Sequence, residues 1–386
     1  MRRLVVLCAA LVFVDTMLYA ALTPLLPHFA HEFGLSKARA GVLVASYATG
    51  ALLAGLGGGV TATRLGPRRA VLIGLTLMSV ASVGFAFAGD FWSLFGARLV
   101  QGLASGFTWA GAFAWLLAVV PRERRGEIMG TAMGSATFGA MFGPVVGAAA
   151  ALAGRDVVFS VLAGSSVVLG AWALRIESAP SAQPSLAAVG RALRNRTFLT
   201  GLGLMSLGSL LFGILSVLGP LHLAAAGWSA AAIGAVWLVG AGFETVQAPV
   251  TGRLSDRYGA LRPTRVALVG AAALSLALAT GARPLVYVPL IVVAAIFYAV
   301  FLTTSFALLA DGAEEAGLAQ GMSFGLMNVA WAGGAVTGPA AGGAIASATG
   351  DWIPFLLAAV ICAAVLGALR ARELGRVPAK LSAPGA

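Results

Sequence analysis

Apolar runs of about 20 residues recur along the whole chain and alternate with short breaks that contain charged residues, proline or glycine. A run of that length is enough for a helix to cross the hydrocarbon core of a bilayer. The runs therefore predict an all-α membrane protein with twelve transmembrane helices. Their expected ranges are 4–30, 40–62, 70–89, 92–120, 127–153, 157–175, 198–224, 230–252, 264–282, 284–310, 317–347 and 352–370.

The first run could be mistaken for a signal peptide because it follows Arg2 and Arg3. It stays apolar past Asp15 as far as Phe29, however, and contains no convincing small-residue cleavage site. We interpret it as a retained first helix.

Composition supports a membrane protein. Hydrophobic residues make up 59% of the chain, charged residues only 10%, and the mean hydropathy is +0.94. A soluble domain carries about 25% charged residues, so this chain could not cover a water-facing surface with polar groups. The two cysteines, Cys8 and Cys362, lie inside apolar runs, which leaves neither a disulfide framework nor a zinc site. We expect no metal and no cofactor.

The net charge of +11 has a topological explanation. If the chain starts in the cytoplasm, 20 of the Lys and Arg residues fall in inner breaks and the tail, whereas the outer breaks hold Lys37, Arg39, Arg155 and Arg283. This asymmetry follows the positive-inside rule, so we expect a multi-pass protein of the cell inner (plasma) membrane with both termini cytoplasmic. Basic residues confined to short breaks do not indicate nucleic-acid binding. One inner break, at 311–315, is acidic and departs from the pattern.

Two motifs repeat with nearly the same period. A glycine-containing loop after the second run, at 59–69, matches a loop after the eighth run, at 252–259, with an offset of 193 residues; the pair Gly143-Pro144 matches Gly338-Pro339 with an offset of 195. The chain is therefore expected to consist of two six-helix pseudo-repeats, as in transporters. We predict an N-terminal bundle at 1–175, a cytoplasmic linker at 176–197 and a C-terminal bundle with a short cytoplasmic tail at 198–386.

These motifs also carry a family resemblance. The pattern Gly252-x-Leu-x-Asp256-Arg257-x-Gly259 resembles the signature of the major facilitator superfamily, and the run 98–102 resembles its membrane-embedded arginine motif. Gly143-Pro144 resembles the motif of its proton-coupled antiporters. Segments 14–27 and 328–343 resemble the drug:proton antiporter branch, which includes multidrug efflux and vesicular monoamine transporters. The resemblance implies the major facilitator fold and alternating access.

The chain departs from the family pattern at two places. Thr63 stands where the first loop of the family has an aspartate, so a charge-mediated gate should be built differently in that half. The vesicular relatives carry further acids in their tenth and eleventh helices, but the matching stretches here, 301–305 and Asn328, have none. These differences bear on amine selectivity and on the number of protons.

Three ionisable residues fall inside the predicted spans: Asp15, Arg98 and Glu244. Such residues are costly in a membrane and usually face a cavity or a partner. At about 1.5 Å per residue, Asp15 and Arg98 reach similar depths and could pair. In one interpretation Asp15 is the proton or cation site and Arg98 tunes its proton affinity; in the other they form a static structural pair. Glu244 is either a second protonation site or a protonated acid bonded to a neighbouring helix.

Aromatic residues are the second feature of the expected substrate site. A cavity lined by aromatic rings suits a lipophilic and cationic solute through burial and cation–π contact. The alternative, ordinary packing or lipid-facing aromatics, is expected for about half of them. The candidate substrate-binding residues are Asp15, Tyr19, Phe107, Phe212, Glu244, Phe297, Tyr298, Phe301, Phe324, Asn328 and Trp331.

The repeated motifs supply candidate gating residues. Glycines spaced four apart allow helices to approach closely, and a following proline permits a bend. The loops at 59–69 and 252–265 are expected to form an inner gate. The gating candidates are Gly59, Arg64, Gly66, Gly252, Asp256, Arg257, Gly259, Gly143, Pro144, Gly338 and Pro339.

The sequence thus predicts a proton-coupled secondary transporter that exports a small amphiphilic or cationic compound. Its partners are a small-molecule substrate, protons and the lipid bilayer, and we expect a monomer. No phosphate loop, nucleophile–base pair or metal cluster indicates an enzyme. The alternatives are an exporter of a polar metabolite such as a sugar, an exporter of a lysolipid, and a non-transporting membrane receptor or scaffold.

Overall fold

The computed structural model describes residues 1–121, 125–178, 186–318 and 320–374, and every regular element within them is an α-helix. The predicted all-helical fold class is confirmed. In the first half the helices are α1 (Arg2–Ala20), α2 (Leu22–Glu32), α3 (Lys37–Arg64), α4 (Pro67–Ala86), α5 (Phe91–Val119), α6 (Arg125–Ala153) and α7 (Arg155–Leu174). They are followed by α8 (Leu186–Ala192), α9 (Arg196–Ala225), α10 (Ala230–Tyr258), α11 (Leu261–Ala279), α12 (Pro284–Glu315), α13 (Gln320–Thr349) and α14 (Trp352–Leu374).

Most of these helices are long and apolar enough to cross a membrane. Among the described residues 11 segments meet this condition, with α1 and α2 counted together as one span. Helix α13 is equally long at 30 residues but rich in glycine, which lowers its hydropathy. It packs between α3 and α9, so its small residues face other helices. With α13 the long helices match the twelve predicted runs.

The first predicted helix, 4–30, is divided into α1 and α2 at Ala21. Pro24 lies in the first turn of α2 and has no N–H to donate to the carbonyl of Ala20, four residues earlier. Such a missing bond is a usual cause of a bend in a transmembrane helix.

Two predicted loops are helical, and the predicted loop 59–69 is helical as far as Arg64, where α3 ends. Residues 252–258 were expected to belong to a loop, but they form the last turns of α10. The acidic segment 311–315 was also expected to be a loop and forms the end of α12. Both segments are polar. The apolar runs therefore indicate the part of each helix suited to the membrane, and the helices continue beyond that part.

The internal repeat has direct structural counterparts. Ser36 and Ser229, 193 residues apart, are the N-caps of α3 and α10, and each side chain accepts a backbone N–H three residues later. Gly66 and Gly259, also 193 apart, both have positive φ, at 92° and 80°. A residue with a side chain rarely adopts that conformation, so the two turns require glycine.

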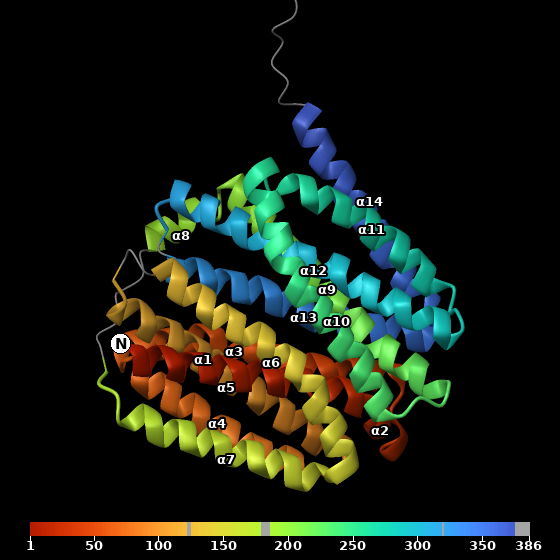
Figure 1. Cartoon of the computed structure of the whole chain (residues 1–386), viewed down its shortest axis with the longest axis horizontal. Helices are drawn as coiled ribbons and strands as arrows, with labels where there is room; N and C mark the ends of the chain where they lie inside the picture. The colour runs from red at the N-terminus through yellow and green to blue at the C-terminus, as the bar shows by residue number, and fades with distance from the viewer. Residues whose placement is uncertain (122–124, 179–185, 319, 375–386) are drawn as a thin grey trace, which may run out of the picture.

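The two halves lie side by side in the molecule. Figure 1 shows α1–α7 gathered in the lower part of the view and α9–α14 in the upper part. The most extensive contacts between the halves are α3 with α13 and α6 with α10, and smaller ones join α2 to α9 and α10, α3 to α9, and α5 to α13. We call the side where α1 begins and α14 ends the terminal side, and the side where α3 and α14 begin the outer side. Parts of three predicted regions, the basic break (122–124), the linker (179–185) and the tail (375–386), lie outside the described residues.

The buried core is continuous across the two halves in one region only. The largest apolar cluster contains residues of both halves, such as Leu22 and Leu43 with Ile214 and Leu218. A second cluster, around Trp115, belongs to the first half, and a third belongs to the second half and α8. The halves are therefore joined by a shared core in one region and carry separate cores in another.

Helix α8 lies within the predicted linker and is attached to the second half. Ala188 and Ala192 are buried in the third cluster. The Arg191 Nε donates to the carbonyl of Ala316, at 3.1 Å, and the Asn195 side chain donates to Glu315, at 2.7 Å. The end of α12 thus accepts hydrogen bonds from side chains of the segment that joins the halves.

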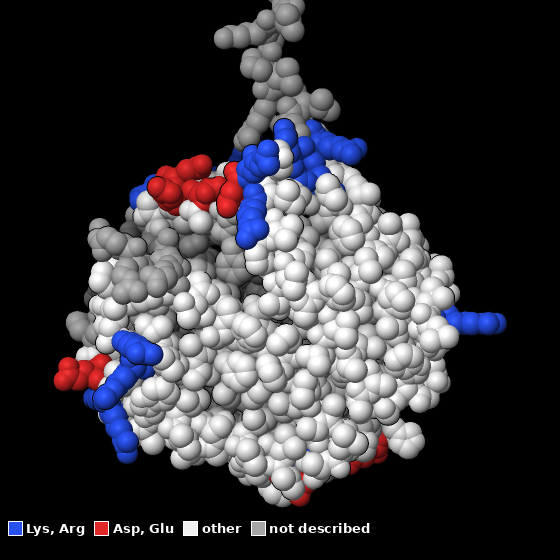
Figure 2. All heavy atoms as spheres, in the orientation of Figure 1, with Lys and Arg blue, Asp and Glu red and all other residues white. Residues whose placement is uncertain are grey.

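Figure 2 shows a broad surface without charged side chains across the centre of the view, with Lys, Arg, Asp and Glu gathered mainly at its left and upper margins. An uncharged band of this kind suits contact with lipid chains.

Candidate functional site

Asp15 lies in the middle of α1, where its side chain is only 4% exposed. Its Oδ2 accepts two hydrogen bonds from α5: one from the Ser105 hydroxyl at 2.9 Å and one from the Trp109 indole N–H at 2.7 Å. These two donors are four residues apart and thus share a face of α5. The other oxygen, Oδ1, is buried and has no hydrogen-bond partner among the described residues. One half of the carboxylate is held by the protein, and the other half is left unpartnered.

Arg98 is also buried, but it does not form the predicted ion pair with Asp15. Its guanidinium donates to the carbonyls of Leu18 at 3.0 Å and Tyr19 at 3.1 Å, and to the Gln101 side chain at 3.1 Å. The contacts His28–Glu32 and Lys37–Asp351, within 4 Å in the described part of the chain, involve neither Asp15 nor Arg98.

The bend between α1 and α2 explains why Arg98 binds carbonyls. The carbonyl groups at a helix C-terminus lack partners and carry partial negative charge, which a cation stabilises. The guanidinium also lies over the Tyr47 ring, with 4.8 Å from Cζ to the centroid. Arg98 therefore fastens α5 to the bent first span.

Four polar residues around Asp15 and Arg98 lie outside the predicted site: Tyr47, Gln101, Ser105 and Trp109. A signal for three of them was available in α5. Positions 98, 101, 105 and 109 are separated by three, four and four residues, which places them along one face of a helix. Tyr47 is on α3, whose sequence gives no comparable pattern.

Two aromatic contacts connect the halves on either side of the Asp15 level. On the outer side of it, the Tyr19 ring of α1 lies 5.3 Å from the Trp331 ring of α13; we call this pair the outer bridge. On the terminal side, the Phe113 ring of α5 stacks on the Phe324 ring of α13, with centroids 5.6 Å apart and planes 13° apart; we call it the terminal bridge. Asn328 is located between Phe324 and Trp331 on α13, at the spacing of one helix face.

The remaining aromatic candidates lie elsewhere. Phe107 is on another face of α5 and lies against Gly57 of α3. Tyr298 is 1% exposed, and its hydroxyl is 2.9 Å from that of Ser275 on α11. Three more pack within the second half: Phe212 on Tyr298, Phe297 on Gly270 and Phe301 beside Gly208. The structure thus brings Tyr19, Phe324, Asn328 and Trp331 toward the Asp15 region and leaves these five apart from it.

Glu244 lies on α10 and is half-buried. No hydrogen bond or ion pair of its carboxylate is found within the described residues. Gln247, three residues later, donates to the Thr251 hydroxyl at 2.6 Å, and its own Oε1 is buried without a partner. Glu244 is therefore separate from the Asp15 site, on a helix that contacts α6 and α12.

The glycine stripes pack each half internally. Gly139, Gly143 and Gly147 of α6 lie against the backbone of α1 and the bend at Ala21. Gly334 and Gly338 of α13 lie against the backbone of α9 in the corresponding way. A Cβ at any of these positions would collide with backbone or side-chain atoms of the facing helix, so the absence of a side chain allows the close approach.

The prolines after these glycines lie at the boundary between the halves. Gly41 of α3 abuts Pro339 of α13, and Gly234 of α10 abuts Pro144 of α6. The two glycines are 193 residues apart and the two prolines 195 apart, so these contacts are equivalent in the repeat. The two halves therefore meet on the outer side through two equivalent contacts.

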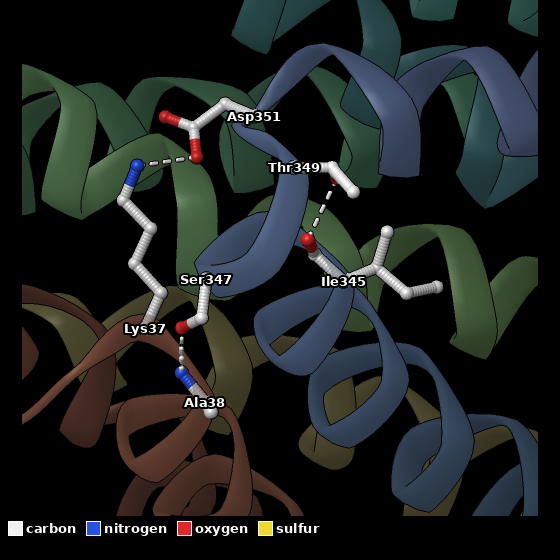
Figure 3. A network of polar contacts seen from close by, with 6 residues as sticks. All are labelled: Lys37, Ala38, Ile345, Ser347, Thr349 and Asp351. Carbon is white, nitrogen blue, oxygen red and sulfur yellow. Dashed lines mark hydrogen bonds and ion pairs between the residues drawn. The ribbon is translucent and has the colours of Figure 1, made fainter.

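A polar clasp accompanies one of the two contacts. Figure 3 shows the Lys37 ammonium, at the start of α3, pointing toward the Asp351 carboxylate that precedes α14, and the Ala38 N–H donating to the Ser347 hydroxyl at 2.8 Å. Residue 230, which occupies the position of Lys37 in the second half, is alanine. The clasp is therefore not duplicated.

The other gating candidates lie on the terminal side. Arg64 ends α3, and Gly66 and Gly259 form the turns after α3 and α10. Asp256 and Arg257 are exposed in the last turn of α10, where Arg257 lies over the Tyr258 ring. A Cβ at Gly59 or Gly252 would meet nothing within 4 Å, so neither glycine is required for packing in this structure.

Comparison with known proteins identifies the family. The model of the Major Facilitator Superfamily matches residues 7–323. Over 112 residues the chain is 39% identical to "Probable vesicular acetylcholine transporter-B" of Danio rerio. The aligned segment covers 27% of this chain and 22% of that protein. Over 107 residues it is 30% identical to "Quinolone resistance protein NorA" of Staphylococcus aureus strain MRSA252. This aligned segment covers 28% of each protein. The aligned segments span less than a third of the length of each relative. The chain belongs to the Major Facilitator Superfamily and is a multi-pass membrane protein.

Proposed function

We propose that the protein is a proton-coupled secondary transporter that exports a small amphiphilic or cationic compound by alternating access. The observation that carries this proposal is the carboxylate of Asp15, buried in the first half with one oxygen held by α5 and the other without a partner among the described residues. An unpartnered carboxylate oxygen in a low-dielectric site is costly, so a proton or a cation that reaches it is bound favourably.

Competition for one carboxylate would give exchange. If a proton and a cationic solute both bind at Asp15, each is released when the other arrives, and a proton gradient can drive the solute outward. The neighbouring rings of Tyr19 and Trp331 offer cation–π contact and apolar surface to the same solute. Asn328 would contribute a neutral polar group from the opposite half. We propose these residues, with Phe324, as the substrate-binding set.

The relatives favour this class of substrate. One is named for quinolone resistance and the other for acetylcholine transport. Acetylcholine is a cation and quinolones are amphiphilic, and both features suit a site with one acid among aromatic rings.

Glu244 and Arg98 have different proposed parts. Glu244 is a candidate for a second protonation site because its carboxylate is in the membrane region of α10 and makes no ion pair within the described residues. Arg98 acts indirectly, because its donors are used on the carbonyls of α1 and on Gln101. It would keep the bend of the first span, and with it Asp15, in position.

Alternating access requires two closures that open in turn. We propose that the paired contacts Gly41–Pro339 and Gly234–Pro144, with the Lys37–Asp351 clasp, close the outer side. We propose that the turns at Gly66 and Gly259, with Arg64, Asp256 and Arg257, guide the opening of the terminal side. By the positive-inside rule the terminal side faces the cytoplasm, and the membrane is the plasma membrane. Residues 1–175 and 198–386 would move relative to each other as two bundles. The protein would act as a monomer.

Flux into proteoliposomes tests the proposal. Purified protein is reconstituted, a pH gradient is imposed without ATP, and uptake is measured for three probes: ethidium as a lipophilic cation, a labelled sugar and a labelled lysolipid. Protein-free vesicles correct for passive permeation. We expect ethidium to move against its gradient only while the pH gradient lasts, and we expect Asp15→Asn to abolish this movement.

The other outcomes favour the alternatives. Movement of the sugar alone or the lysolipid alone would replace the proposed substrate class. Loss of movement in Glu244→Gln but not in Asp15→Asn would transfer the proton site to α10. No movement of any probe by a folded protein would favour a non-transporting receptor or scaffold.

A further inference from the structure

We propose that Trp109 is a positioning residue that couples the charge of Asp15 to the closure of the terminal side. This inference rests on the proposed function, because it assumes that Asp15 gains and loses a proton. Trp109 contacts the carboxylate at one end and the terminal bridge at the other. It therefore offers a physical connection between the proton site and a contact that joins the two halves.

The connection consists of four consecutive contacts. The indole N–H of Trp109 donates to Asp15 Oδ2 at 2.7 Å. The Trp109 ring lies 5.4 Å from the ring of Phe113, one helical turn later on α5. Phe113 stacks on Phe324 of α13 at 5.6 Å, and Phe324 lies 6.3 Å from Phe306 of α12. A carboxylate in the first half is thus linked through two rings of α5 to a ring of the second half.

The terminal bridge is a weak point of the interface. Around it the buried cores are separate, one in each half, and Phe324 is the partly buried residue that packs against both. On the outer side, by contrast, the halves share a core and two close backbone contacts. A small displacement of Phe113 should therefore affect the closure of the terminal side more than it would affect a continuous core.

Protonation changes how strongly Asp15 holds the indole. A hydrogen bond to an ionised carboxylate is about twice as strong as one to a neutral acceptor. When Asp15 is ionised, Trp109 is held toward α1 and supports Phe113 against Phe324. When a proton occupies the unpartnered Oδ1, Oδ2 becomes a neutral acceptor and the indole is held less tightly. Protonation should therefore loosen the terminal bridge, which is the step that lets a proton leave toward the cytoplasm.

Other titratable groups near Asp15 are few. The guanidinium of Arg98 on α5 and the phenols of Tyr19 on α1 and Tyr47 on α3 face the site. Helix α13 carries no charged residue, and α6 carries charges only in its first three residues, at 125 and 127. Arg98 is already bonded to carbonyls, so the change of charge falls on the contact between Asp15 and its two donors on α5.

A distance measurement across the terminal side tests the coupling. Spin labels are attached to Val119→Cys at the end of α5 and Glu314→Cys at the end of α12, both exposed, in protein reconstituted into nanodiscs. The native Cys8 and Cys362 are buried. Distance distributions are recorded at pH 5.5 and pH 8.5. We expect a longer distance at the lower pH in the parent protein, and a pH-independent long distance in Asp15→Asn.

Trp109→Phe is the decisive variant, because it keeps a ring beside Phe113 but removes the N–H. We expect it to lose the pH-dependent shift. Trp92→Phe is the matched control: it makes the same substitution on α5, at an exposed ring 69% accessible and remote from Asp15, and should keep the shift. A cooperative thermal unfolding transition of Trp109→Phe in detergent separates loss of coupling from loss of fold.

The outcomes distinguish this inference from the proposed function. A shift that is abolished by Asp15→Asn but retained in full by Trp109→Phe would overturn the coupling and leave Asp15 as the proton site. A shift that survives Asp15→Asn, or no shift in the parent protein, would overturn both. A shift lost equally in Trp92→Phe would show that any aromatic substitution on α5 disturbs the closure, and the role of Trp109 would then be only structural.

Discussion

At the scale of single residues, the arginine and the aspartate in the first half have separate tasks. Arg98 donates to two carbonyls beside the bend of the first span, whereas Asp15 is held by two donors of α5. Side-chain hydrogen bonds to a charged group contribute about 1.5–3 kcal/mol each in proteins. The guanidinium therefore chiefly fastens α1 to α5, and in the proposed mechanism the aspartate is the group that exchanges a proton.

Arg98→Ala should consequently lower stability rather than move the pH dependence of transport. It leaves the carbonyls of Leu18 and Tyr19 buried without their donor, so we expect a loss of at least about 1.5–3 kcal/mol, seen as a lower melting temperature in detergent. Arg98→Lys should recover part of this, because one ammonium cannot reproduce the planar guanidinium contacts.

The complementary measurement is the transport rate as a function of pH, normalised to the amount of folded protein. An Arg98→Ala protein with unchanged melting temperature and a displaced pH optimum would mean that Arg98 acts on the charge of Asp15 and not on the bend.

The pairing of Asp15 and Arg98 was a reasonable expectation from depth alone, but depth does not give direction. Two residues at similar heights on neighbouring helices pair only if their side chains face each other. The deciding fact was the bend at Ala21, which leaves carbonyls available to the guanidinium. Pro24 marks that bend in the sequence, whereas the choice of partner depends on packing between helices.

At the scale of helices, the proposed outer closure depends on small residues at equivalent positions of the repeat. Gly41 and Gly234 each permit a proline-containing helix of the other half to approach closely. Overfilling such a contact costs about 1–3 kcal/mol. A side chain at either position should therefore favour conformations in which the outer side is open.

Gly41→Val tests this directly. A penalty of about 1–3 kcal/mol corresponds to a population change of about 5- to 150-fold toward the open outer side. Spin labels at His31→Cys and Thr349→Cys, both exposed, report the opening as an increase in distance. Gly55→Val, on the same helix where a Cβ would meet nothing within 4 Å, is the matched control. Equal distances in the two variants would contradict the proposed closure.

Asp90 offers a pH-dependent test of a helix end outside the membrane spans. Its carboxylate accepts the backbone N–H groups of Ser93 and Trp92, and these bonds lower the pKa of Asp90. A lowered pKa in the folded state adds stability above the unfolded value, about 3.9, and that stability is lost as the pH falls through the folded value. Asp90→Ala should thus lower the melting temperature slightly at pH 7 and by less at pH 3. A larger effect at pH 3 would have the wrong sign.

The helices themselves were largely predictable, and the exceptions share one cause. Apolar runs located the crossings because hydrocarbon excludes polar side chains, but a helix can continue beyond the membrane when its polar residues still form backbone hydrogen bonds. The end of α10, with Asp256 and Arg257, and the acidic end of α12 are such continuations. The aromatic candidates were harder to sort, because an aromatic ring such as Phe301 serves a core as well as a cavity.

At the scale of the whole molecule, the two halves repeat a scaffold but differ in charge. The glycine–proline contacts occur at equivalent positions in both halves, whereas the Lys37–Asp351 clasp occurs at one of them (Figure 3). The side chains of this pair are 38% and 28% exposed, and such pairs contribute about 0.2–1 kcal/mol. The packing contacts should therefore dominate the closure and the clasp should adjust it.

Asp351→Asn should accordingly open the outer side less than Gly41→Val. We expect at most about a fivefold change in population, measured with the labels at positions 31 and 349. Adding about 1 M salt should reduce the difference between Asp351→Asn and the parent, because salt screens exposed charges. An effect of Asp351→Asn as large as that of Gly41→Val would indicate that charge, not packing, holds the halves together.

The measurement that tests the central claim most directly is proton movement driven by the solute. Proteoliposomes that contain a trapped pH indicator are loaded with ethidium, and the internal pH is followed as ethidium leaves down its gradient in the absence of any imposed pH gradient. The account predicts proton entry that accompanies ethidium exit in the parent protein, and none in Asp15→Asn at equal amounts of folded protein. Proton entry that continues unchanged in Asp15→Asn would contradict it.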